Sequence, residues 1–170
     1  IILDESTELK PLGMSKIVTY RNYDNEFYKK LWLLNGLHLQ LAYYGLANGD
    51  TYIDEVLSSK EGREFGESAI KSLAEAYTLM SNSNENLDKF SKTIINRFAL
   101  PEIKDEVTRI ARNPEIKFSK NERFEYPLRL LIANNKNIET FSKILNIVTL
   151  GDFPQVEGFS SFKEVVLEKG

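Results

Sequence analysis

Three polar residues, Lys30, Asn35 and His38, stand within a stretch that is otherwise strongly apolar. In an α-helix, with about 100° of rotation per residue, the three fall near roughly 0°, 140° and 80°, on one side over about two turns. An amine, an amide and an imidazole are groups that transfer protons and hydrogen-bond substrates in enzymes. A buried polar group must in any case be hydrogen-bonded, and a buried charge needs a partner or a shifted pKa. The trio is therefore the first candidate for a functional site.

The residue types alone leave two interpretations of the trio open. In the first, Lys30 extends to solvent from near the start of its helix, while Asn35 and His38 hydrogen-bond the backbone of a neighbouring element. In the second, the three side chains act on a bound molecule. A catalytic trio must open on a concave surface at one end of the domain, near the start of the chain. A non-catalytic helical interaction module needs the trio sealed inside.

The trio belongs to a predicted helix over residues 24–45. Asp24 is placed to cap its first turn, and Glu26 adds negative charge there. Asn48 and Gly49 are residue types that end a helix in the left-handed conformation. A helix that is apolar all round is buried, so this one should occupy the centre of the domain. Its apolar residues point in nearly every direction: Leu31, Trp32, Leu33, Leu34, Leu37, Leu39 and Leu41.

The spacing Lys-x4-Asn-x2-His resembles the motif of the long-chain polyol dehydrogenase family, which includes the mannitol dehydrogenases. Residues 30–38 (Lys-Leu-Trp-Leu-Leu-Asn-Gly-Leu-His), 42–45 (Ala-Tyr-Tyr-Gly) and 51–55 (Thr-Tyr-Ile-Asp-Glu) look like that family's first long helix and the turn after it. Residues 97–110 (Arg-Phe-Ala-Leu-Pro-Glu-Ile-Lys-Asp-Glu-Val-Thr-Arg-Ile) resemble its pattern Arg-Phe-x-Asn-Pro-x-Leu-x-Asp-x-x-x-Arg-Val.

A later segment resembles the mannitol-1-phosphate branch of the same family. Residues 112–114 (Arg-Asn-Pro), 117–119 (Lys-Phe-Ser) and 121–124 (Asn-Glu-Arg-Phe) look like that branch's Arg-Asp-Pro, Lys-Leu-Ser and Asn-Asp-Arg-Leu. The match covers most of residues 20–150. The chain departs from the family pattern at Leu100, Asn113, Ile116 and Glu122.

The resemblance implies that residues 1–170 are the C-terminal helical domain of an NAD-dependent, metal-independent polyol or polyol-phosphate dehydrogenase. NAD would be carried on an N-terminal dinucleotide-binding domain absent from this chain, since none of the nine glycines forms a G-x-G-x-x-G after a strand. By the resemblance, Lys30 is the general base, with a pKa lowered by desolvation. Asn35 donates to the alkoxide-like oxygen, and His38 positions the substrate hydroxyl. The chain alone is expected to be inactive.

Arg112, Lys117, Lys120 and Arg123 gather four cations within twelve residues of an otherwise acidic chain. Such a cluster is either a solvated loop or an anion site, since arginine suits a phosphate or a carboxylate. With the resemblance, Lys117, Arg123 and Arg112 are expected to bind the substrate, a sugar phosphate such as mannitol 1-phosphate or fructose 6-phosphate. The Leu-Leu-Asn-Gly-Leu-His run is also similar to the hexuronate reductases, which act on tagaturonate or fructuronate. Both kinds of substrate are anionic, so a basic loop does not separate them.

The rest of the chain predicts a mainly α, multi-helix bundle with a short extended or β segment at its N-terminus. Apolar spacing and capping residues indicate helices at 51–57, 61–79, 87–98, 101–110, 120–133, 138–150 and 159–169. Residues 1–3 and 16–20 are short strand candidates, with a turn at 11–13 between them. We expect these first residues to be the exit from the dinucleotide-binding domain of a larger protein. The alternatives are a small hairpin or a chain trimmed for other reasons.

Composition excludes several classes of protein. A length of 170 residues suits one domain with a real core. A net charge of −3 and a pI near 5.4 argue against a nucleic-acid surface, and no apolar run approaches the roughly 20 residues of a membrane span. Without cysteine, and with one histidine, disulfides and ordinary zinc sites are excluded. We expect a cytoplasmic protein whose partners are a small-molecule substrate and its own N-terminal domain.

Overall fold

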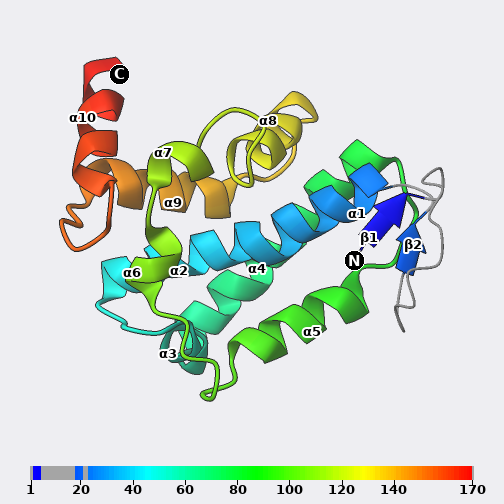
Figure 1. The fold of residues 1–170 in the computed structure, drawn as a ribbon, viewed down its shortest axis with the longest axis horizontal. Coiled ribbons are helices and arrows are strands. Elements are labelled where there is room, and N and C mark those ends of the chain that lie inside the picture. The colour runs from blue at the N-terminus through cyan, green and yellow to red at the C-terminus, as the bar shows by residue number, and fades with distance from the viewer. Residues whose placement is uncertain (1, 5–17, 21–22, 170) are drawn as a thin grey trace.

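The computed structural model describes residues 2–4, 18–20 and 23–169, and Figure 1 shows a body built of helices. The expectation of a mainly α bundle is confirmed. The helical elements follow one another along the chain as α1 (Tyr23–Lys29), the π-helical segment η1 (Lys30–Gly36), α2 (Leu37–Asn48), α3 (Ile53–Ser58), α4 (Lys60–Ser81), α5 (Asp88–Phe98), α6 (Val107–Ala111), α7 (Pro114–Lys117), α8 (Glu125–Ala133), α9 (Glu139–Leu150) and α10 (Phe159–Lys169).

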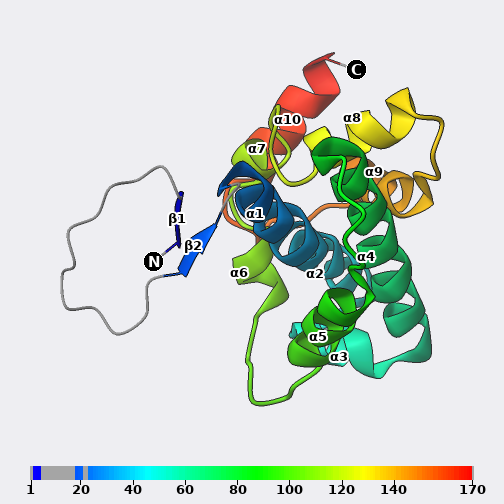
Figure 2. The same cartoon turned by 90° about the vertical axis from the view of Figure 1, so that its right-hand side faces the viewer.

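The elements α1, η1 and α2 form one continuous rod through the middle of the body (Figures 1 and 2). Helix α2 packs against α3, α4, α6 and α9, and α4 also contacts η1, α5 and α8. From Leu31 to Gly45 this rod is apolar on nearly every side, so neighbours must cover it there. Trp32, Leu33 and Leu37 accordingly have no exposed surface. The prediction that this helix forms the centre of the domain is confirmed.

Several helix ends follow the residue types that the sequence supplies. Gly49 ends α2 in the left-handed conformation, with φ at 82°, as predicted. Ser59 caps α4, because its side-chain oxygen accepts a hydrogen bond from the amide of Gly62 at 3.0 Å. The cap assigned to Asp24 is wrong, because α1 begins at Tyr23 and Asp24 already lies within its first turn.

Two helices begin later than predicted. Instead of a helix over 101–110, only α6 forms, and the preceding residues pair with the segment before α3. The amide of Ile53 donates to the carbonyl of Asp105 and the amide of Val107 donates to the carbonyl of Thr51, both at 3.0 Å. These bonds to a distant segment replace the local bonds of a helical turn. Similarly, α8 begins at Glu125 rather than at residue 120.

At the N-terminus, β1 (Ile2–Asp4) and β2 (Val18–Tyr20) pair in parallel, with Ile2 opposite Val18. Figure 2 shows the pair beside the helical body. The expected β segment is therefore present. A hairpin needs antiparallel strands, so the hairpin alternative is wrong. The turn predicted at 11–13 lies outside the described residues. Within the described part of the chain, none of the helices has the length and apolar character needed to cross a membrane.

Candidate active site

The candidate site starts in η1, the π-helical segment that interrupts the rod between α1 and α2. In a π-helix each backbone hydrogen bond spans five residues, so residues five apart stand about one turn apart. Lys30 and Asn35 are five apart and therefore lie closer to one face than the roughly 140° expected for an α-helix. His38 follows within the first turn of α2. Such π segments within α-helices frequently lie at functional sites.

Two adjacent lysines at the start of η1 have different surroundings. Lys29 is buried, donates to a carboxylate oxygen of Glu85 and lies 4.9 Å from the ring centroid of Phe90. Lys30 is exposed, because neighbouring residues of a helix point in directions about 100° apart and only one of the two can face Glu85. The expected burial of Lys30 is therefore wrong. The described residues therefore do not supply the desolvation on which its role as a base depends.

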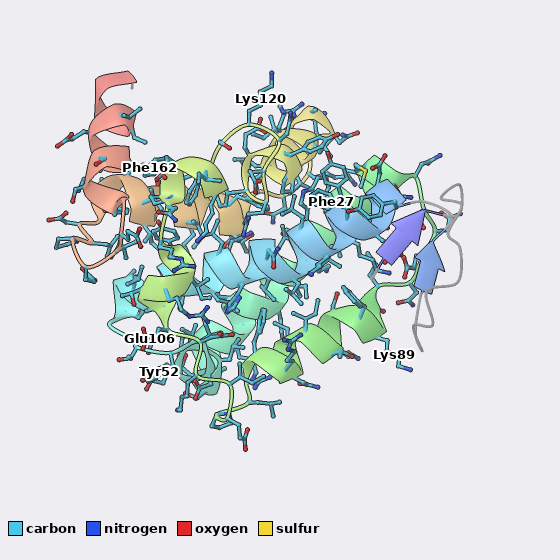
Figure 3. All side chains as sticks on the ribbon, in the orientation of Figure 1. Phe27, Tyr52, Lys89, Glu106, Lys120 and Phe162 are labelled. Carbon is cyan, nitrogen blue, oxygen red and sulfur yellow. The ribbon has the colours of Figure 1, made fainter. Side chains whose placement is uncertain are left out.

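A pocket of about 200 Å³ opens beside the rod where η1 meets α2. It collects side chains from η1, α2, α6 and α7 and from the loop before α8. Asn35 and His38 line it together with the three predicted substrate-binding cations, so neither of these two trio members is sealed inside. Lys30 does not line it. Lys120 does not either, and Figure 3 shows this side chain pointing away from the body. The lining residues are Asn35, His38, Leu39, Arg109, Ile110, Arg112, Lys117 and Arg123.

The Asn35 side chain is available to a bound molecule. It is half-buried at the pocket wall, and none of the hydrogen bonds between described residues engages its amide. A side-chain amide can donate two hydrogen bonds and accept two. The interpretation in which Asn35 ties the rod to a neighbour's backbone is therefore wrong among the described residues. Its N–H donors can instead bind a molecule in the pocket.

His38 is held by an aromatic ring and a carboxylate. Its ring stacks on Phe98, with centroids 4.3 Å apart and 23° between the planes. Its Nε2 is enclosed and lies 3.3 Å from Oδ2 of Asp105, close enough for attraction but not aligned as a hydrogen bond. Burial lowers the pKa of His38 to about 4; Asp105 raises it, while Arg109, Arg97 and Lys117 lower it further. At neutral pH the imidazole is uncharged, with one donor nitrogen and one acceptor nitrogen.

Lys117 closes another side of the pocket. Its ammonium donates to the carbonyl of Ile110 at 2.7 Å and to the carbonyl of Arg112. Burial lowers the pKa of Lys117 to about 8, and the cations of Arg123 and Arg112 act in the same direction. An ammonium has three donors, so one is left for an anion in the pocket. Lys117 thus both fixes the turn between α6 and α7 and contributes charge to the site.

Arg123 reaches the pocket because its backbone lies directly against η1. A Cβ added to Gly36 would stand 2.9 Å from the carbonyl oxygen of Arg123, closer than real side chains approach. A glycine inside a helix costs about 1 kcal/mol relative to alanine, so it needs a packing reason. Here the reason is the close approach of the loop before α8. The Arg123 side chain itself donates from Nε to Glu122 at 3.2 Å.

Sequence reasoning missed two residues of this region, Arg109 and Asp105. Arg109 lines the pocket, and its Nη2 donates to Oδ1 of Asp105. In the sequence both residues stand out only as part of the resemblance over 97–110. Their spacing of four residues is one at which an acid and a base pair across a helical turn. That pairing was the available signal, although Asp105 lies just before α6 rather than within it.

Comparison with known proteins gives a consistent set of relatives. A family model described as the mannitol dehydrogenase C-terminal domain matches residues 25–150. The mannitol-1-phosphate 5-dehydrogenase of Clostridium acetobutylicum is 35% identical over 106 residues, which cover 60% of this chain and 27% of that protein. The enzyme of the same name from Mycoplasma pneumoniae is 31% identical over 131 residues, covering 76% and 36%. The chain therefore spans between about a quarter and about a third of these relatives' length.

A solved structure has the same fold. It is the mannitol 2-dehydrogenase of Pseudomonas fluorescens, in a ternary complex with NAD and D-mannitol. It superposes with a TM-score of 0.71 at 18% sequence identity, over 90% of this chain and 32% of that one. At this identity the likeness establishes the arrangement of helices and nothing finer.

Proposed function

The chain belongs to the mannitol dehydrogenase C-terminal domain family, and from that premise we propose that it is the substrate-binding and catalytic domain of an NAD-dependent, metal-independent polyol-phosphate dehydrogenase. The proposed reaction interconverts mannitol 1-phosphate and fructose 6-phosphate. One observation carries the proposal: Asn35 and His38 share a pocket with the cations Arg112, Lys117 and Arg123. The names of the Clostridium and Mycoplasma relatives support a phosphorylated substrate.

The size of the pocket suits a sugar better than a dinucleotide. Its volume is about 200 Å³, whereas pockets for drug-sized ligands occupy about 300–1,000 Å³. We therefore assign NAD to an N-terminal dinucleotide-binding domain of the complete enzyme. The solved relative, whose complex contains NAD and D-mannitol, supports NAD as the cofactor. NAD, when bound, would accept the hydride from the carbinol carbon. The chain on its own is then predicted to be inactive.

The residues of this chain would handle the hydroxyl proton and the oxygen. As the hydride leaves, the O–H bond must release its proton to a base. Lys30 takes this proton at Nζ, and in the reverse reaction its ammonium returns the proton to the carbonyl oxygen. Asn35 donates its amide hydrogens to the same oxygen while negative charge develops on it. His38, uncharged at neutral pH, orients the substrate through a neighbouring hydroxyl.

Lys30 must be shielded from water before it can act as a base. A lysine in water is an ammonium at neutral pH and has no free electron pair for a proton. Beside it, α1 exposes Tyr23 and Phe27, which are 41% and 47% accessible and whose ring centroids are 6.4 Å apart. Figure 3 shows Phe27 at the α1 end of the rod. Two exposed aromatic rings that pack on each other offer apolar surface to a partner. We assign it to the N-terminal domain, whose docking would remove water from Lys30.

The cations of the pocket suit two classes of anion. Arg112, Lys117 and Arg123, with Arg109 beside them, are suited to the phosphate of a sugar phosphate. The same charges suit the carboxylate of a hexuronate such as tagaturonate or fructuronate. The Leu-Leu-Asn-Gly-Leu-His run around Asn35 keeps this second candidate open. A reductase of hexuronates would use the same residues with the carboxylate in place of the phosphate.

Binding to this chain tests the proposal without the cofactor domain. Mannitol 1-phosphate, mannitol and tagaturonate are each titrated against the protein while the imidazole signals of His38, its one histidine, are followed by NMR. Mannitol 1-phosphate should bind at least about tenfold more tightly than mannitol, since a charged contact contributes about 1.5–3 kcal/mol. In Lys117→Met the difference should shrink. Tighter binding of tagaturonate would favour the hexuronate reductase, and no binding of any of the three would contradict the proposal.

A further inference from the structure

Asp105 does not line the pocket, but its carboxylate contacts two residues that do, His38 and Arg109. Its Oδ2 lies 3.3 Å from Nε2 of His38, and its Oδ1 accepts from Nη2 of Arg109. The backbone of Asp105 is fixed on both sides. Its amide donates to the carbonyl of Ile103 at 2.9 Å, and its carbonyl accepts from the amide of Ile53 at 3.0 Å. The carboxylate is therefore held in place by the chain around it.

The imidazole of His38 has little freedom to turn away from this carboxylate. Stacking on Phe98 fixes the plane of the ring, and Nε2 is the enclosed nitrogen. A neutral imidazole carries its proton on one of two nitrogens, and the hydrogen bond at one nitrogen decides the state of the other. A carboxylate oxygen facing a nitrogen lone pair is repelled, whereas a carboxylate facing an N–H is attracted. Asp105 therefore favours the proton on Nε2.

We propose that Asp105 is a positioning residue, which holds His38 in the tautomer with its proton on Nε2 so that Nδ1 accepts a hydrogen bond from a substrate hydroxyl. Through its other oxygen it also holds Arg109 at the pocket. The role of Nδ1 toward a hydroxyl rests on the proposed function, but the tautomer is a property of the chain alone. In the presence of substrate the 3.3 Å contact should tighten, as such contacts do.

This arrangement determines what the pocket accepts beside His38. An acceptor nitrogen binds a hydroxyl, which can donate, and rejects a carbonyl or ether oxygen, which cannot. The ring must also stay uncharged, because a second proton would turn Nδ1 into a donor. Burial and the cations Arg97, Arg109 and Lys117 keep it so, against the opposite influence of Asp105. At this position the site thus selects a sugar or sugar alcohol that carries a hydroxyl there.

The single histidine makes the tautomer directly measurable. In ¹⁵N-labelled protein the two imidazole nitrogens give one pair of signals, whose shifts at pH 7 distinguish the two tautomers. The unmodified chain should carry its proton on Nε2. Asp105→Asn, which removes the charge at nearly unchanged shape, should lose this preference and lower the pKa of His38 further. Glu106→Gln is the matched control, since Glu106 is the exposed next residue, and it should behave as the unmodified chain.

A proton on Nδ1 in the unmodified chain would overturn the proposal, and this result needs no variant. An unchanged tautomer in a folded Asp105→Asn would overturn it as well. In the complete enzyme Asp105→Asn should raise KM for the polyol about tenfold, with a smaller change in kcat. If the tautomer depends on Asp105 but no polyol, polyol phosphate or hexuronate is turned over, the proposed function fails and the positioning role stands. If a polyol phosphate is turned over but the tautomer is independent of Asp105, the positioning role fails and the proposed function stands.

Discussion

At the scale of single residues, the surroundings of the pocket disfavour the charged forms of Lys117 and His38. Burial lowers the pKa of His38 to about 4 and that of Lys117 to about 8. Arginine keeps its charge at any pH at which a protein is folded. The positive potential of the pocket therefore rests on Arg109, Arg112 and Arg123 at all pH values, with Lys117 adding to it below about pH 8.

The stability of the chain should fall between pH 6.5 and about 4 because of His38. In the unfolded chain a histidine takes up a proton near 6.5, but the folded chain resists protonation until about 4. The unfolded state thus binds more protons in this window, and stability rises with pH across it, by up to about 3 kcal/mol. The free energy of unfolding in urea at pH 7.0, 5.5 and 4.5 measures the slope. His38→Asn should lose the part of the slope above pH 5, and an equal slope in this variant would contradict the pKa assignment.

The lowered pKa of Lys117 predicts that anion binding weakens at alkaline pH. Above about pH 8 its ammonium loses its proton, so one charged contact to the anion is lost. Affinity for mannitol 1-phosphate should therefore fall by about tenfold between pH 7 and pH 9, in keeping with about 1.5–3 kcal/mol for a charged hydrogen bond. Calorimetric titration at both pH values is the measurement. Lys117→Met should bind mannitol 1-phosphate weakly at pH 7, and its affinity should change little up to pH 9. If this variant shows the same pH dependence as the unmodified chain, the dependence comes from another group.

At the scale of elements, the rod was predicted but its π segment was not. The all-round apolar pattern and the types of Asn48 and Gly49 predicted a buried helix and its end correctly. No local signal in the sequence marks η1. The sequence around Lys29 and Lys30 likewise does not show which of them is buried. Glu85, more than fifty residues further along the chain, pairs with Lys29 and so decides it.

Gly36→Ala tests the contact between η1 and the loop before α8. Alanine would gain about 1 kcal/mol in helix propensity, but its Cβ would meet the Arg123 carbonyl at 2.9 Å. Overpacking against backbone costs about 1–3 kcal/mol. We expect stability lowered by about 1 kcal/mol and weaker binding of mannitol 1-phosphate, because the loop must move outward. Ala47→Gly, at an exposed position of α2, gives the propensity term alone in thermal unfolding. A stabilised Gly36→Ala with unchanged binding would contradict the role of this glycine.

The segment before α6 illustrates a second limit of sequence reasoning. Pro101 and the apolar spacing after it suggested a helix over 101–110, yet the chain there forms backbone bonds with residues 51–53. Such pairing depends on where α3 lies in the fold, which no local pattern encodes. The consequence is functional, because this pairing places Asp105 beside His38. Of the two residues that sequence reasoning missed, Asp105 lies where the predicted helix does not form, whereas Arg109 lies in α6.

At the scale of the whole molecule, the pocket assembles groups that are distant in sequence. Asn35 and His38 come from the central rod, while Arg112, Lys117 and Arg123 come from segments more than seventy residues later. Residue types and spacing could identify each of these side chains as a candidate site residue. Only the resemblance to a family linked them, and only the fold places them at one surface. The remaining member of the trio, Lys30, lies outside this pocket on an exposed face.

The exposure of Lys30 makes it the residue that tests the proposed mechanism most directly. In the complete enzyme, turnover of mannitol 1-phosphate with NAD at pH 7 is compared for Lys30→Ala and for Lys89→Ala, an exposed lysine of α5 that does not line the pocket and is labelled in Figure 3. We predict that Lys30→Ala loses about 10² to 10⁴ in kcat, the usual contribution of a general base, while its thermal unfolding is unchanged and Lys89→Ala retains full activity. Unchanged turnover in Lys30→Ala would contradict the assignment of Lys30 as the base.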